Sequence, residues 1–130
     1  MTSLDFLSPD RARTDLGFAP VARSSMERRQ REAGAAFEER DGWLVAVKLP
    51  HEERHLRHAG IVDLSHLAKA EVTGRVPSPV VGETLRHAIT KDKAIVLSPT
   101  GQGAAVRARL AEAGATVLDV TGALSALAVI

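Results

Sequence analysis

Hydrophobic and polar positions alternate most clearly around an Asp-Gly pair in the first half of the chain. In "AAFEERDGWLVAVKL", apolar side chains occupy every second position after Asp41-Gly42, beginning with Trp43. A period of two is typical of a half-buried strand, and Asp-Gly is a strong signal for a tight hairpin turn. The pattern therefore predicts a β-hairpin over residues 35–49, ended by Pro50.

Two segments carry helical patterns. Ser24 precedes Glu27 by three positions, which is a capping-box spacing, and predicts a short helix over residues 26–33 that ends at Gly34. The segment "GAAVRARLAEAG" predicts a longer helix with one apolar face. Val106, Leu110 and Ala113 are expected to form that face, and Gly114 is expected to be the C-terminal cap.

The remaining pattern predicts strands with a few short helices between them. One or two strands are expected in "GIVDLSHLAKAEVTG", and one each in "KAIVLSP", "TVLDV" and "ALSALAVI". Short helices are expected in "HEERHLRHA" and over residues 84–89. Paired strands with helices laid against them predict an α+β fold. Residues 1–23 have no sustained period and predict an irregular lead-in, followed by one domain over residues 24–130.

Composition restricts the possible functions. Seventeen basic residues against sixteen acidic ones give a formal net charge of +1, and aromatic residues are 3% of the chain, so neither a polyanion partner nor a stacking surface for nucleic acid is expected. The chain has no cysteine, which excludes disulfides, thiolate zinc sites and cysteine nucleophiles and is compatible with a cytoplasmic protein. No apolar run approaches the roughly 20 residues that span a bilayer, so no membrane partner is expected.

The stretch "AGIVDLSHLAK" contains the three side chains of a hydrolytic triad, Asp63, Ser65 and His66. In a strand, Asp63 and Ser65 would share one face and His66 the other, whereas a triad needs serine, imidazole and carboxylate in one hydrogen-bonded row. The pattern G-x-S-x-G is also missing around Ser65. We therefore favour a turn, in which the Asp and Ser side chains bond nearby backbone amides.

The segment "HEERH" matches the zinc-binding string H-E-x-x-H, with His51, Glu52 and His55, and His58 follows at helical spacing. A zinc-binding helix of that kind is long and largely buried. Here charged residues surround almost the whole circumference, so a solvated helix face is favoured over a metal site.

The segment "IVLSPTGQGAAVRARLAEAGATVLDV" has the outline of a dinucleotide-binding unit: a strand, Gly101-x-Gly103, a helix, and a strand that ends near Asp119. Val106 stands where the third glycine of that fingerprint would be. An ordinary strand–helix–strand packing unit is therefore favoured over nucleotide binding. Trp43 is likewise interpreted as core or pocket wall before ligand platform.

Three segments together resemble the N-terminal region of the glycine-cleavage T-protein family, the folate-binding aminomethyltransferases related to sarcosine oxidase and dimethylglycine dehydrogenase. "SSMERRQREAGAAFEERDGWLVAV" is similar to the opening helix and Gly-Trp hairpin of the family. "GIVDLSHLAKAEVTG" is similar to its Gly-Leu-x-Asp-x-Ser-His-Met-Gly segment, and "DVTGALSALAVI" to the strand that runs into Gly-Pro. The resemblance covers roughly residues 22–130 and follows the family order.

The chain departs from that family in three places. The stretch before Gly60 is about one residue shorter than expected. Leu67 and Ala68 stand where methionine and glycine are usual. "RVPSPVVGETLRHAITKD" is shorter than the corresponding section and lacks its paired-aspartate segment, whose carboxylate contacts folate. Since the chain also stops inside the apolar "LAVI", we expect an N-terminal piece of a longer protein, or a compact, diverged member.

The resemblance implies the ferredoxin-like half of a T-protein-type folate-binding domain, present incompletely. It implies tetrahydrofolate as cofactor, a small amine as one-carbon donor, and a lipoyl-carrier or flavoprotein partner. It further implies a folate pocket near Trp43, Asp63, Ser65, His66 and Leu67, with no assignable catalytic base. The alternative is a non-catalytic folate-binding or structural subunit of a sarcosine oxidase-like complex, which the missing aspartate pair favours.

Overall fold

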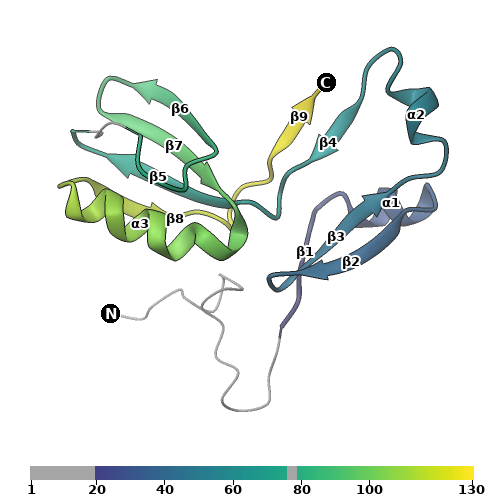
Figure 1. Ribbon diagram of the computed structural model, residues 1–130, viewed down its shortest axis with the longest axis horizontal. Coiled ribbons are helices and arrows are strands. Elements are labelled where there is room, and N and C mark those ends of the chain that lie inside the picture. The colour runs from purple at the N-terminus through teal and green to yellow at the C-terminus, as the bar shows by residue number, and fades with distance from the viewer. Residues whose placement is uncertain (1–19, 76–78) are drawn as a thin grey trace. The chain divides into compact units, whose positions relative to one another are not determined.

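The computed structural model describes residues 20–75 and 79–130, which form two compact units (Figure 1). Of the described residues, the first unit contains 20–66 and 125–130, and the second contains the rest of the stretch from Leu67 to Leu124. Most of the expected lead-in, residues 1–19, lies outside the described residues. The expectation of a single domain over residues 24–130 stays a prediction.

The predicted hairpin is confirmed in the first unit. Strands β2 (Ala36–Arg40) and β3 (Trp43–Lys48) pair antiparallel, with Arg40 opposite Trp43. The turn residues Asp41 and Gly42 both have positive φ, 49° and 78°, which is the backbone that a two-residue primed turn requires. Trp43 is buried, and the short strand β1 (Ala22–Arg23) lies parallel to β3 on its other side.

Helix α1 (Glu27–Glu32) is present as predicted, but not through a capping box. Its N-cap is Met26, which makes no side-chain cap. Glu27 instead accepts hydrogen bonds from Arg23 at 3.1 Å and from Arg31, four positions further on, at 2.7 Å. The helix ends where expected, since the N–H of Gly34 bonds to the Arg31 carbonyl.

A short two-stranded ribbon completes the first unit. Strand β4 (Ile61–Asp63) pairs antiparallel with β9 (Leu127–Val129), placing Ile61 opposite Val129 and Asp63 opposite Leu127. The strand predicted over "ALSALAVI" is therefore shorter than expected. The Ala123 N–H bonds to the Val120 carbonyl, which turns the chain before the strand begins.

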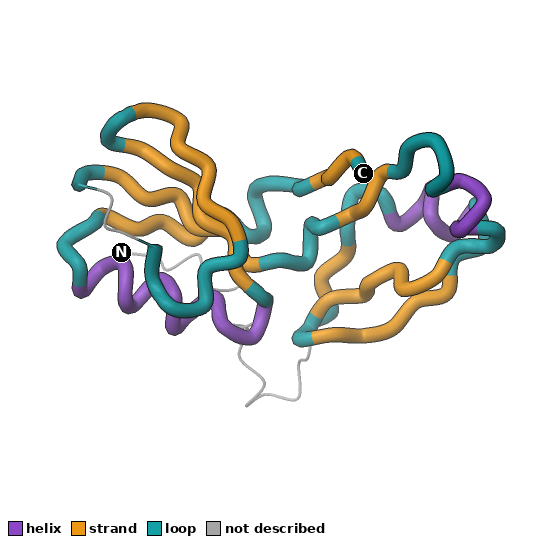
Figure 2. Tube along the Cα trace, turned by 45° about the horizontal axis from the view of Figure 1, so that its top comes forward, coloured by secondary structure: helices purple, strands orange, loops and turns teal. Residues whose placement is uncertain are grey.

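The second unit is a sheet with one long helix on one face (Figures 1 and 2). Its strand order is β6-β7-β5-β8, so that β5 separates the two strands joined through the helix. This is a split β-α-β arrangement, and it confirms the mixed α+β fold. The elements are β5 (Ala68–Thr73), β6 (Leu85–Thr90), β7 (Lys93–Ser98), the 3₁₀ turn η3 (Thr100–Gln102), α3 (Gly103–Glu112) and β8 (Thr116–Asp119).

Helix α3 packs on the core of this unit with two of the three predicted residues, Val106 and Leu110, but not with Ala113. Val106 and Leu110 are at most 1% exposed and pack with Val72 and Val96 from the sheet. Ala113, however, is exposed, because the helix ends at Glu112 and the turn that follows directs Ala115 into the core instead.

The helical turn predicted over residues 84–89 is wrong, since Leu85–Thr90 is strand β6. Its backbone pairs with β7, with Leu85 opposite Leu97, and the Thr84 N–H bonds to the Leu97 carbonyl just before the strand. Pairing with a distant strand thus overrides the local pattern.

Substitution of Gly114 tests whether its left-handed backbone conformation stabilises the end of helix α3. Its φ is +91°, and no atom lies within 4 Å of where a Cβ would be, so an added methyl group would cost only backbone strain. We expect Gly114→Ala to lower the free energy of unfolding by about 1 kcal/mol in urea denaturation. Gly114→Asn should lower it less, because asparagine tolerates this conformation. Equal losses for both variants would contradict the strain argument.

Candidate functional site

The "DLSH" segment forms a turn at the end of β4, as predicted. The Ser65 N–H donates to Asp63 Oδ1 at 3.0 Å, closing a local loop of side chain and backbone. Ser65 is only 3% exposed, and its hydroxyl accepts a hydrogen bond from the Ala126 N–H at 3.2 Å. The serine thus attaches the turn to the segment that leads into β9.

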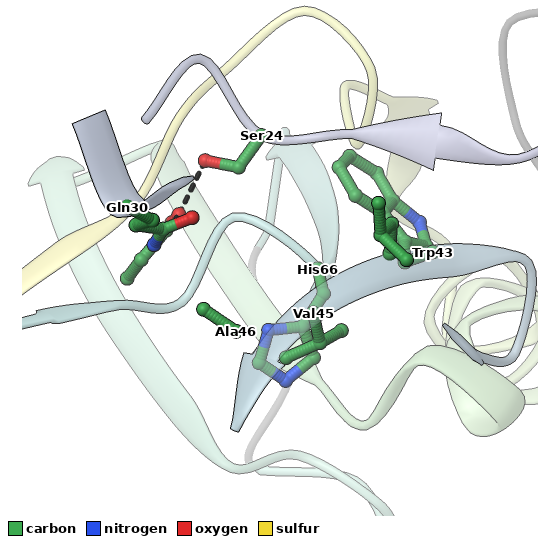
Figure 3. Close-up of a pocket in the computed structure, with 8 residues that line it drawn as sticks. Ser24, Gln30, Trp43, Val45, Ala46 and His66 are labelled. Carbon is green, nitrogen blue, oxygen red and sulfur yellow. Dashed lines mark hydrogen bonds between the residues drawn. The ribbon is translucent and has the colours of Figure 1, made fainter. Parts of the chain in front are cut away.

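The second carboxylate oxygen of Asp63 joins this turn to two more segments. Oδ2 accepts a short hydrogen bond from the Ser24 hydroxyl, drawn dashed in Figure 3, and another from the Gln30 amide at 3.0 Å. Ser24 lies just before α1, Gln30 lies within it, and Asp63 ends β4. One half-buried carboxylate therefore holds the helix, its approach and the strand together.

These contacts determine the charge of Asp63. Burial acts to raise its pKa, but the hydrogen bonds from Ser24, from the hydroxyl and N–H of Ser65, and from Gln30 together hold the pKa below its ordinary value of 3.8. Asp63 is therefore ionised at neutral pH. A carboxylate with a lowered pKa is a weak proton acceptor, so Asp63 is suited to positioning and not to general-base catalysis.

The lowered pKa predicts an acid-dependent stability. A group whose pKa is lower in the folded chain stabilises the fold above its unfolded pKa, and this contribution is lost as the pH falls through the folded pKa. The free energy of unfolding should thus decrease as the pH falls below about 4.

Urea unfolding at a series of pH values should show a shallower decrease for Asp63→Asn than for the unsubstituted chain. The pKa of Glu27 is also lowered, chiefly by its hydrogen bond from Arg31, so part of the decrease should remain. Parallel curves for both proteins would contradict the role given to Asp63.

The hydrogen bonds around Asp63 are those of a turn. Its carboxylate accepts hydrogen bonds from the Ser24 hydroxyl, the Gln30 amide and the Ser65 N–H. Val45 and His66 both line the cavity drawn in Figure 3. The turn interpretation of this segment is therefore confirmed.

Three of the five residues expected at a folate pocket line a small cavity. Trp43, Asp63 and His66 surround a space of about 10 Å³ together with residues of α1, its approach and β3 (Figure 3). Ser65 does not line it. Leu67 opens the second unit, where its carbonyl accepts a hydrogen bond from the Lys69 ammonium at 2.9 Å. A space of this size holds about one water molecule and no pterin ring.

A larger groove of about 220 Å³ adjoins this cavity and was not predicted from the sequence. Gln30, Ala46 and Asp63 line both hollows. Arg29 from α1 and Glu52 from α2 (Glu52–His55) contribute opposite charges to the groove wall. The remaining lining residues are Met26, Ala33, Leu49, Ile61, Val62 and Leu127.

The histidines do not form the helical row that "HEERH" suggests. Helix α2 is four residues long, His51 precedes it with a left-handed φ of 58°, and His58 follows it. All three histidines are exposed. Over residues 20–75 and 79–130, no group of three or more His, Cys, Asp or Glu side chains could hold a metal ion.

The Gly101-x-Gly103 segment belongs to a packing unit. Strands β7 and β8 are not neighbours, since β5 lies between them, whereas a dinucleotide-binding unit places its two strands side by side. Asp119, which would bind the ribose in that interpretation, forms an ion pair with Arg107 at 3.0 Å, and both side chains are 9% exposed. The nucleotide-binding alternative is therefore contradicted.

No helix in the described part of the chain is long and apolar enough to cross a membrane. No protein-family model matches the chain, and no curated protein matches it significantly.

One solved structure with a similar fold is the crystal structure of glycine cleavage system aminomethyltransferase T from Bartonella henselae. It matches with a TM-score of 0.63 over 84% of this chain, at 17% sequence identity. This chain spans 40% of the length of that structure. The relation to sarcosine oxidase stays a prediction. The likeness shows that the chain has part of the T-protein fold.

Proposed function

We propose that this chain is part of a folate-dependent aminomethyltransferase-like protein, which transfers a one-carbon unit from an amine donor to tetrahydrofolate. The observation that carries the proposal is the likeness of fold to an aminomethyltransferase over 84% of the chain. The three sequence segments around the hairpin, the "DLSH" turn and the last strand support it independently of the coordinates. The turn is built around an ionised carboxylate whose contacts reach into α1.

The proposed reaction moves a carbon between nitrogen atoms without oxidation or reduction. The carbon of the aminomethyl donor bonds to N5 of tetrahydrofolate and its bond to the amine breaks. Methylene-tetrahydrofolate forms when the same carbon bonds N10 and its bond to the remainder of the donor breaks. The protons lost by N5 and N10 leave with the amine and with the remainder of the donor. Holding the pterin and the donor in contact supplies much of the rate in such a transfer.

The groove, at about 220 Å³, has room for a pterin ring. Gln30 and Glu52 offer an amide and a carboxylate to the polar edge of a pterin, and the aliphatic side chains of Leu49 and Val62 offer apolar contact. Arg29 offers a cation for the carboxylates of the folate tail. In this proposal Asp63 is a positioning residue that keeps Gln30 at the groove.

Titration calorimetry with tetrahydrofolate tests the proposal. The chain should bind tetrahydrofolate and not NAD, and Arg29→Ala should weaken binding about tenfold through loss of a charge-assisted contact. Arg28→Ala is the matched control, because Arg28 neighbours it on the same helix, pairs with Glu32 and does not line the groove. Absence of heat with tetrahydrofolate would refute folate binding. Equal losses in both variants would place the ligand elsewhere.

A second measurement separates the enzyme from a non-catalytic subunit. The chain is mixed with tetrahydrofolate and an aminomethyl donor, and methylene-tetrahydrofolate is measured. Formation above the uncatalysed rate supports the transferase. Binding without transfer would favour the folate-binding subunit of a larger complex.

A further inference from the structure

The segment that joins β3 to β4, residues 51–59, contains α2 and is exposed along its whole length (Figure 1). The hydrogen bonds that its backbone N–H groups donate end on carbonyls of His51, Glu52 and His55, inside the segment itself. Within residues 20–75 and 79–130, no hydrogen bond or ion pair joins it to the rest of the chain. A segment with no buried side chain and only internal hydrogen bonds opens at a low free-energy cost.

Close packing fixes the chain at both ends of this segment. A Cβ at Gly34 would come within 3.2 Å of Pro50, so the proline ring lies directly against that glycine. A Cβ at Gly60 would overlap the side chain of Leu56, which therefore covers the glycine. His51 has a φ of 58° and turns the chain directly after Pro50. A self-contained helical turn between two fixed ends is the arrangement of a hinged strap.

The same segment reaches the groove through Glu52, which lines it together with Arg29. In the part of the chain that the structure describes, the Glu52 carboxylate accepts no hydrogen bond and forms no ion pair, with Arg29 or with any other residue. An ionised carboxylate accepts several hydrogen bonds. Glu52 can therefore bind the N–H groups of a ligand in the groove without giving up a protein partner.

We propose that residues 51–59 form a strap that closes over a ligand in the groove when Glu52 binds that ligand. The identity of the ligand rests on the proposed function, in which the N–H groups along the pterin edge of tetrahydrofolate donate to the carboxylate in a charge-assisted pair. This pair exists only in the bound state, so it orders a segment that otherwise opens readily. The closed strap keeps water away from the carbon that is transferred.

Limited trypsin digestion of the full chain, followed by mass spectrometry, tests whether the strap opens. Arg54 and Arg57 lie in the strap, so local opening presents the bonds that follow them to the protease. Among the described residues of the first unit, we expect these two bonds to be cut first. Arg40 provides the comparison, because it is also exposed but lies in the paired strand β2. Cleavage after Arg40 as early as after Arg54 would overturn the proposal, whatever the chain binds.

Digestion with tetrahydrofolate tests whether the strap closes. At a free concentration about ten times the dissociation constant measured by calorimetry, the strap bonds should be cut about tenfold more slowly. A small peptide substrate in the same tube should be cut at an unchanged rate, which excludes inhibition of trypsin. Heat in the calorimeter without protection of the strap would overturn closure and leave folate binding intact. Absence of heat would overturn both proposals.

Two variants of α2 test the part played by Glu52. At matched saturation with tetrahydrofolate, Glu52→Gln should lose most of the tenfold protection of the strap, because the amide cannot form the charge-assisted pair. Glu53→Gln is the control, since Glu53 is its exposed neighbour on the same helix and does not line the groove. Full protection in Glu52→Gln, or an equal loss in Glu53→Gln, would overturn closure through Glu52.

Discussion

Replacing Leu110 with alanine should lower the free energy of unfolding of the second unit by about 3 kcal/mol. Leu110 is 0% exposed and lies in the core between α3 and the sheet, in one cluster with Val72 and Val96. Removing its branched side chain loses apolar burial and leaves a cavity that the two-layer packing cannot fill completely. Urea denaturation measures the loss.

Leu118→Ala is the matched control for this substitution. Leu118 lies in β8 of the same sheet but is 59% exposed, so the same truncation removes little buried surface. We expect a change within about 0.5 kcal/mol. If both leucine variants lost similar stability, α3 would not cover the sheet as described.

Replacing Asp63 with alanine should lower the free energy of unfolding of the first unit by about 2 kcal/mol. The substitution leaves the Ser24 hydroxyl, the Gln30 amide and the Ser65 N–H without their shared acceptor. Partial exposure of this site lets water replace some of these bonds, which keeps the loss below the sum of three charged hydrogen bonds. Hydrogen exchange should show faster opening of α1.

Asp92→Ala provides the comparison for Asp63→Ala. Asp92 is an exposed aspartate in the second unit, and its ion pair with Lys91 is solvent-accessible. Its loss should change stability by less than about 0.5 kcal/mol. A loss for Asp63→Ala as small as that for Asp92→Ala would show that the carboxylate does not hold the three segments together.

The hairpin turn and the end of helix α3 were predicted correctly, because both depend on residues that are neighbours in the sequence. Asp41-Gly42 determines its hairpin because both residues adopt the positive φ that the turn needs, and Gly114 ends α3 for a related reason. Strand β6 was mistaken for a helical turn because its conformation depends on pairing with β7, which local sequence does not report.

The site was only partly predictable for the same physical reason. The turn at Asp63 and Ser65 is local and was expected from the residue types. The other partners of Asp63, namely Ser24 and Gln30, lie 39 and 33 positions away, and no sequence pattern links them to it. The groove was missed entirely, because its walls come from α1, β3, α2, β4 and β9, which are distant along the chain.

Hydrogen–deuterium exchange of the full chain tests folate binding at the groove most directly, because it shows both whether tetrahydrofolate binds and which backbone amides it protects. With tetrahydrofolate we expect slower exchange of backbone amides in α1 and β4, next to the groove residues Gln30 and Val62, and with NAD we expect no change. Unchanged exchange with tetrahydrofolate, or protection by NAD around Gly101 and the start of α3, would contradict it.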